Sequence, residues 1–118
     1  MSGRLNDVFR ARTKTYAASI IRLYVKLPKA REEVRVVGKQ LLRSGTSVAA
    51  HVREASRARS TAEFISKLGG ALQEADESML WMELLNEECG IADDLIQPLL
   101  KESNELIAIL TTMKKRSE

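Results

Sequence analysis

Residues 40–85 read QLLRSGTSVAAHVREASRARSTAEFISKLGGALQEADESMLWMELL, and this stretch decides the fold. Apolar and small residues recur along it at alternating steps of three and four, which is the period of one face of an α-helix. The rhythm is interrupted once, at Ser60-Thr61-Ala62-Glu63, which reads as a capping box that begins a new helix. The stretch therefore predicts two long helices joined by a tight turn.

Both helices extend beyond this stretch. The first is predicted over residues 30–59, because Glu32 and Glu33 suit the positive end of a helix dipole. Its buried face is expected to hold Val34, Val37, Leu41, Ser44, Val48, His51, Ala55 and Ala58. The second is predicted over residues 61–89, with Gly90 as its C-terminal cap. Its buried face is expected to hold Phe64, Leu68, Ala71, Ala75, Ser78, Met82 and Leu85.

Two outer segments carry the same period. A helix over residues 5–27 ends at Pro28, and its buried face is Phe9, Thr13, Tyr16, Ile20, Leu23 and Leu27. A helix over residues 94–115 begins late or bends at Pro98, and its buried face is Leu95, Leu99, Leu106, Leu110 and Met113, with Ile96, Leu100 and Ile107 beside it. Because the loops are short, we predict an all-α, up-down-up-down antiparallel four-helix bundle that forms one domain of residues 1–118.

The composition agrees with a small helical protein. Hydrophobic residues make up 44% of the 118 residues and aromatic residues only 4%, so aliphatic side chains must fill the core. No apolar stretch approaches the roughly 20 residues that span a bilayer, and residues 1–12 lack the apolar core of a signal peptide. The single cysteine, Cys89, reads as a packed thiol. We therefore expect a cytoplasmic protein without membrane partners.

Two features exceed the needs of an isolated bundle. Residues 79–85 are apolar nearly all round the predicted helix, so one side must face something other than its own core. Burial against sister subunits is the simplest explanation, which predicts a homo-oligomer. Gly38, Gly45 and the pair Gly69-Gly70 interrupt helices, and each costs about 1 kcal/mol relative to alanine. We expect close helix approach or a kink at these positions.

The charges are divided between the two halves of the chain. Residues 1–60 contain fourteen Lys and Arg against four Asp and Glu, a net charge of +10, whereas residues 61–118 carry −7. Such a division can pair helices within the bundle, pair neighbouring subunits, or leave a basic surface for a polyanion. The sequence leaves these alternatives open.

The basic residues are the candidates for binding nucleic acid. They are Arg10, Arg12, Lys14, Arg22 and Lys26 on the first helix and Arg31, Arg35, Arg43, Arg53, Arg57 and Arg59 on the second. From this set we select Arg22, Lys26, Arg31, Arg35, Arg43, Arg53, Arg57 and Arg59. Arginine binds phosphate with two hydrogen bonds, while the aromatic platforms that stack on bases are missing from the set. Binding would therefore be to the RNA or DNA backbone.

No catalytic apparatus is visible, and we predict no enzyme, no cofactor and no metal. His51 and Glu54 lie three residues apart, which resembles half of a di-metal ligand motif, but the chain has one histidine in total. We interpret them instead as part of a hydrogen-bonded polar layer that sets the register of the helices. This predicted layer consists of Arg43, Ser47, His51, Glu54 and Glu74.

Specific residues between positions 40 and 85 resemble a known family. They are Gln40-Leu41, Arg43-Ser44, Ser47, Arg53-Glu54-Ala55, Ser60, Phe64, Lys67-Leu68, Glu74-Ala75, Glu77, Trp81 and Leu84-Leu85. The pattern is similar to the four-helix-bundle proteins encoded in intervening sequences of bacterial 23S ribosomal RNA genes. The outer helices fit mainly by length, Pro28 and apolar pattern.

This resemblance implies an up-down bundle that assembles as a homopentamer, has no established enzymatic activity and has a proposed link to RNA. More distant relatives are accessory proteins of diversity-generating retroelements, which use a basic surface for nucleic acid. The family usually has Asn where this chain has His51. The leading hypothesis is thus a non-enzymatic oligomer that binds RNA or DNA backbone, and the alternative is a purely structural or protein-interaction oligomer with charge pairing between subunits.

Overall fold

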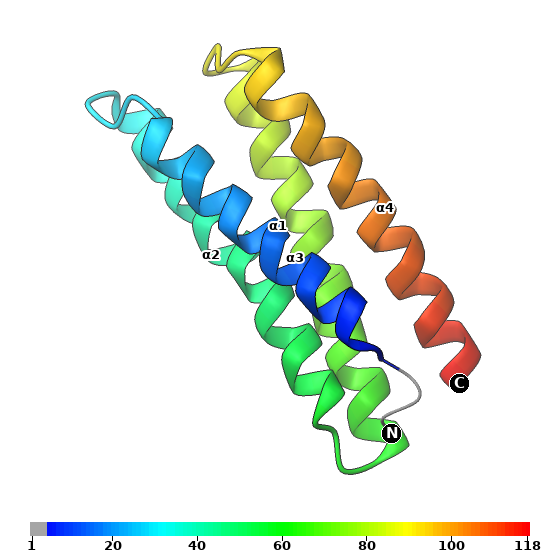
Figure 1. The fold of residues 1–118 in the computed structure, drawn as a ribbon. Coiled ribbons are helices and arrows are strands. Elements are labelled where there is room, and N and C mark those ends of the chain that lie inside the picture. The colour runs from blue at the N-terminus through cyan, green and yellow to red at the C-terminus, as the bar shows by residue number, and fades with distance from the viewer. Residues whose placement is uncertain (1–4) are drawn as a thin grey trace.

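The computed structural model describes residues 5–118 and contains four helices in that part of the chain (Figure 1). They are α1 (Asp7–Lys26), α2 (Glu32–Ser56), α3 (Thr61–Glu87) and α4 (Asp93–Ser117). Consecutive helices run antiparallel and pack along each other, and a smaller contact between α1 and α4 closes the bundle. The described residues measure 45 × 20 × 19 Å. The predicted all-α four-helix bundle is confirmed, and residues 1–4 of the predicted domain lie outside the described part.

Local signals explain most of the helix ends. The side chain of Asn6 accepts a hydrogen bond from the Phe9 amide at 2.9 Å, and Ser60 accepts one from the Glu63 amide at 3.0 Å. Gly90 follows α3 with a φ of 71°, which is the left-handed conformation that glycine adopts without strain. Pro98 lies inside α4, whose helix already begins at Asp93. The expectation that Pro98 delays the start of this helix is therefore wrong.

The buried faces of α1 and α3 agree with the period. All six residues predicted for α1 are buried, as are all seven predicted for α3. The sequence predicts these two faces correctly because almost every residue in them is apolar and follows the steps of three and four without a break. Within residues 5–118, two large aromatic side chains are fully buried in the aliphatic core, Tyr16 and Phe64.

The predictions for α2 and α4 need correction. On α2, Val37 and His51 are only half-buried, while Val52 takes a core position. On α4, the buried residues are Ile96, Ser103, Leu106 and Leu110. The predicted Leu95, Leu99 and Met113 are only partly buried. At the start of α4 the buried face includes Ile96 instead of the predicted Leu95. Ser103 also occupies a core position, and a pattern of apolar residues alone does not predict a buried serine.

A layer of hydroxyl groups crosses the centre of the bundle with one member from each helix. Tyr16, Ser44, Ser78 and Ser103 are all buried. The Ser44 and Ser78 oxygens are 2.7 Å apart, and the Tyr16 and Ser103 oxygens are 2.6 Å apart. Ser78 also lies close enough to the Tyr16 hydroxyl to act on its pKa, so the two pairs are neighbours. This hydroxyl layer aligns the four helices, because each buried hydroxyl must find a partner.

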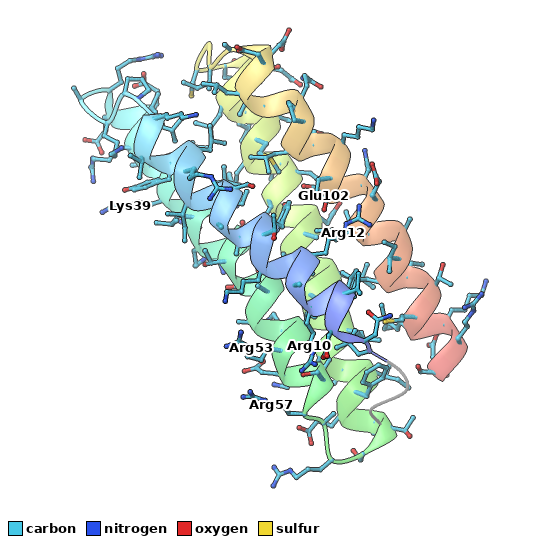
Figure 2. All side chains as sticks on the ribbon, in the orientation of Figure 1. Arg10, Arg12, Lys39, Arg53, Arg57 and Glu102 are labelled. Carbon is cyan, nitrogen blue, oxygen red and sulfur yellow. The ribbon has the colours of Figure 1, made fainter. Side chains whose placement is uncertain are left out.

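An ion pair reinforces the small contact between α1 and α4. The Arg12 guanidinium donates to Glu102 at 2.6 and 2.8 Å and to Glu105 at 2.9 Å, as Figure 2 shows for Arg12 and Glu102. The hydrogen bond with Glu102 raises the pKa of Arg12 above its usual value. Cations of the first half thus pair with acids of the second half inside one bundle.

We expect Arg12→Gln to lower the free energy of unfolding by about 0.5–1 kcal/mol at low salt. The loss should shrink as salt is added, because the pair is partly exposed to screening ions. Urea unfolding at two salt concentrations measures it, and Arg35→Gln, which removes a pair within one helix, is the control. Equal losses in the two variants at both salt concentrations would contradict the role of Arg12 as a link between helices.

Candidate nucleic-acid interface

A groove of about 710 Å³ runs between the first half of α1 and the second half of α2. We call it the α1/α2 groove. Its lining includes four cationic side chains, two acidic ones and small residues, namely Arg10, Lys14, Arg53, Arg57, Asp7, Glu54, Ala11, Thr13, Ala49 and Ala50. Figure 2 shows Arg10 of α1 near Arg53 and Arg57 of α2. The formal charge of the lining is therefore positive.

Helical spacing brings these cations together. Arg10 and Lys14 are four residues apart on α1, as are Arg53 and Arg57 on α2, so each pair lies on one side of its helix. Because α1 and α2 are antiparallel, the start of one meets the end of the other. Ala11, Ala49 and Ala50 leave the space between the two rows of cations open. The result is two short cationic rows on facing walls.

The cations of the groove differ in how far they are neutralised. Among residues 5–118, Lys14, Arg53 and Arg57 form no ion pair. Arg10 pairs with Asp7 one turn earlier, and its buried Nε has no hydrogen-bond acceptor in the described part of the chain. Glu54 lies at the edge of the groove with Lys67 3.4 Å away. Three full charges and one unsatisfied donor are thus available to an anion.

The other six predicted cations lie outside this groove. Arg43 contacts Glu74 at 3.2 Å and Glu77 at 2.5 Å, and the hydrogen bond with Glu77 raises the pKa of Arg43. Four others also contact residues of the chain. Arg31 bonds Glu33 and the Cys89 carbonyl, and Arg35 pairs with Glu32. Arg59 lies 4.0 Å from Glu63, and Arg22 contacts the Ser19 hydroxyl. Lys26 is exposed on α1.

The residues selected from the sequence omit two cations of the groove and one further exposed cation of α2. Arg10 and Lys14 belong to the wider basic set but not to the eight selected cations, although their spacing of four matches that of Arg53 and Arg57. Lys39 of α2 is not among the predicted cations. It is exposed, has no ion pair among residues 5–118, and projects from the side of α2 that also bears Arg53 and Arg57 (Figure 2). A helical projection of the cations of α2 would have placed all three on one side.

The predicted polar layer is divided into two surface groups. Arg43 and Glu74 are in contact, as predicted, but their further partner is Glu77, which also accepts from the Trp81 indole at 3.3 Å. His51 lies 3.5 Å from Glu54, which is shared with Lys67. Among residues 5–118, the Ser47 hydroxyl bonds only the backbone oxygen of Arg43. The buried layer consists of the four hydroxyl residues instead, because charged side chains of this length reach solvent at the helix edges.

Two further observations concern metals and membranes. Among residues 5–118, no three His, Cys, Asp or Glu side chains are placed to hold a metal ion, and Cys89 is a free, buried thiol. No helix in the same part of the chain is both long and apolar enough to cross a bilayer.

The fold and the groove together define a class, that of antiparallel four-helix-bundle proteins with a cationic groove between the first two helices. More particularly, the chain belongs to the 23S rRNA-intervening sequence protein family, whose model matches residues 8–112. The resemblance seen in the sequence is thereby confirmed. A crystal structure from Bacteroides thetaiotaomicron, titled as a protein of unknown function from the S23 ribosomal protein family, is 36% identical. It superposes with a TM-score of 0.81 over 92% of this chain and 96% of that chain. No curated protein matches the chain.

Proposed function

We propose that this chain is a non-enzymatic bundle protein that binds the phosphate backbone of RNA or DNA in the α1/α2 groove. The observation that carries the proposal is the convergence of Arg10, Lys14, Arg53 and Arg57 on one groove, three of them without an ion pair among residues 5–118. Phosphate oxygens accept the hydrogen bonds that these side chains donate. The groove lacks aromatic side chains, so it offers nothing on which a base could stack.

Salt dependence tests this proposal directly. Each phosphate contact releases counterions, so the logarithm of the binding constant falls with the logarithm of salt by about 0.7 per contact on a single strand. Four cations predict a slope of about −3 for a mixed-sequence RNA, measured by fluorescence anisotropy. Arg53→Gln with Arg57→Gln should reduce the slope to about −1.5 and weaken binding at every salt concentration.

The matched control removes two other arginines from the same region of sequence. Arg31→Gln with Arg35→Gln changes the net charge equally, but both side chains already pair with acids at the far end of α2. This control should keep a slope close to that of the unchanged chain. Absence of binding at low salt, binding that salt does not weaken, or an equal loss in the control would each refute the proposal.

The alternative function is a structural or protein-interaction oligomer, and exposed apolar residues on α1 and α3 favour it. The two functions separate when Arg53 and Arg57 are both changed to Glu. Nucleic-acid binding should disappear while the oligomer persists if the groove binds phosphate. If the groove pairs subunits, the same variant should dissociate. The family resemblance implies five copies, a number that light scattering measures directly.

A further inference from the structure

A second depression lies on α3, the helix that packs against both α2 and α4. Its volume of about 610 Å³ is in the range of small-molecule sites. His51 of α2 and Lys114 of α4 contribute to its lining, and the other lining residues lie between positions 66 and 73 of α3. The lining contains no aspartate or glutamate and shares no residue with the α1/α2 groove. We call this depression the His51 pocket.

Two adjacent glycines of α3 form the floor of the His51 pocket. A Cβ atom at Gly70 would lie 2.9 Å from the Nδ1 and Cε1 atoms of His51, so the imidazole ring occupies the space that a side chain at this position would fill. A Cβ atom at Gly69 would meet only the Lys114 Cε atom among residues 5–118, at an ordinary 3.5 Å. Packing inside the bundle therefore requires glycine at position 70 but not at position 69.

Gly69 lowers the stability of its helix without a packing reason. Glycine inside a helix costs about 1 kcal/mol relative to alanine. It also lets another molecule approach the helix backbone closely, because no Cβ atom stands in the way. At Gly69 and Gly70 the surface of α3 stays open between the His51 ring and the aliphatic stem of Lys114. This open floor suits a flat ligand that lies directly on the backbone.

The two lysines of the His51 pocket have only loose ion pairs. The Lys67 Nζ atom lies 3.4 Å from a Glu54 oxygen, and the Lys114 Nζ atom lies 3.8 Å from an oxygen of Glu118. A close hydrogen bond between an ammonium group and a carboxylate measures about 2.7–2.9 Å. Both distances exceed this value, and both carboxylates lie outside the lining of the pocket. The two ammonium groups therefore remain able to donate close hydrogen bonds to an anion.

An aromatic ring distinguishes this pocket from the α1/α2 groove. The His51 side chain is 30% exposed, and its buried Nδ1 atom has no hydrogen-bond partner among residues 5–118. Histidine is one of the aromatic side chains against which flat rings such as nucleobases stack. Leu72 adds apolar surface, while Ser66 and Gln73 supply neutral hydrogen-bonding groups one turn before and after the glycines. The pocket thus combines a surface for a ring with two cations for an acidic group.

We propose that the His51 pocket binds a small phosphate monoester that carries a flat ring, of the class of nucleoside monophosphates. The ring lies on the floor at Gly69 and Gly70 beside the His51 imidazole. The phosphate accepts hydrogen bonds from Lys67 and Lys114, whose flexible stems let both ammonium groups reach it. A nucleoside lacks the charge that the lysines attract, and inorganic phosphate lacks the ring that the floor accommodates. This site is separate from the α1/α2 groove and does not rest on the proposed function.

Proton NMR of the whole chain tests the proposal at the site itself. His51 is the single histidine of the sequence, so in protein without a histidine tag its imidazole protons report on this pocket alone. Adenosine monophosphate, added at constant pH in a buffer without phosphate, should shift the His51 resonance until the site is saturated. Adenosine and inorganic phosphate should each bind more weakly by about tenfold or more, because each lacks one of the two recognised groups.

Two sets of variants test the floor and the cations separately. Gly69→Gln places a side chain on the floor and should remain folded by circular dichroism, because glutamine is the better helix former. It should weaken the binding of adenosine monophosphate by about tenfold or more, as should Lys67→Gln with Lys114→Gln.

The matched control for the cations is Lys101→Gln with Lys115→Gln. It removes the same charge from two exposed lysines that do not line the pocket. The control should bind adenosine monophosphate as tightly as the unchanged chain does. Arg53→Gln with Arg57→Gln should also leave this affinity unchanged, because neither arginine lines the His51 pocket.

Several results would overturn the proposal. Adenosine monophosphate could leave the His51 resonance unchanged, or adenosine or inorganic phosphate could bind as tightly as adenosine monophosphate does. Undiminished binding by folded Gly69→Gln, or an equal loss in the control at Lys101 and Lys115, would also refute it. Gly69→Gln should keep the salt dependence of RNA binding in the α1/α2 groove, so the two proposals can fail independently.

Discussion

Gly45→Ala is expected to lower the free energy of unfolding by up to about 2 kcal/mol, although alanine is the better helix former. A Cβ atom at this position would lie 2.7 and 2.9 Å from the two γ carbons of Ile20 and 3.2 Å from its Cβ. Ile20 is fully buried and β-branched, so its side chain cannot rotate away. Overpacking of about 1–3 kcal/mol therefore exceeds the gain of about 1 kcal/mol in helix propensity.

The matched control is Gly69→Ala, the same substitution inside another helix. Its Cβ would meet only the Lys114 Cε atom, at an ordinary 3.5 Å. We expect this variant to gain about 0.5–1 kcal/mol in the free energy of unfolding. Urea unfolding followed by circular dichroism measures both. Shifts of the same sign would show that propensity, and not the close approach of α1 and α2, decides the outcome at Gly45.

Tyr16→Phe is expected to destabilise the protein by about 1 kcal/mol at neutral pH, because it removes the buried hydrogen bond to Ser103. The same substitution should change the response to alkali. Burial raises the pKa of the Tyr16 hydroxyl above its ordinary value of 10.0, even though hydrogen bonds from Ser103 and Ser78 act in the opposite direction. The folded protein thus holds this proton more tightly than the unfolded chain does.

The sign of the pH effect follows from this difference. Below pH 10 both states keep the proton, so the contribution of Tyr16 to stability is fully present. As the pH rises above 10 the unfolded chain loses the proton first, and the free energy of unfolding falls by up to about 1.4 kcal/mol per pH unit until the folded pKa is reached.

Thermal unfolding between neutral and strongly alkaline pH measures the effect. The destabilisation of Tyr16→Phe relative to the unchanged chain should become smaller as the pH rises above 10. Tyr24→Phe, which removes the other tyrosine hydroxyl and leaves the layer intact, is the control. A difference between Tyr16→Phe and the unchanged chain that stays constant over the whole range would rule out a buried, protonated Tyr16.

The sequence predicts only part of the candidate site. Arg53 and Arg57 were predictable, because their charge and spacing are visible in the chain. Arg43 has the same charge and a similar place on α2, yet Glu74 and Glu77 of α3 neutralise it. Conversely, Arg10 and Lys14 gain their importance from the antiparallel packing of α1 against α2. Which cations stay available to a ligand depends on contacts between residues more than thirty positions apart.

The stretch over residues 40–85 determined the helices, the turn at Ser60 and the buried face of α3, because helical period and capping depend on residues within about one turn. It also carried the family resemblance. Tertiary structure decided which serines form the hydroxyl layer, why Gly45 must lack a side chain, and which charges remain unpaired. Period alone counts apolar residues along one helix, whereas a buried hydroxyl, a close approach or an ion pair exists only once a second helix supplies its partner.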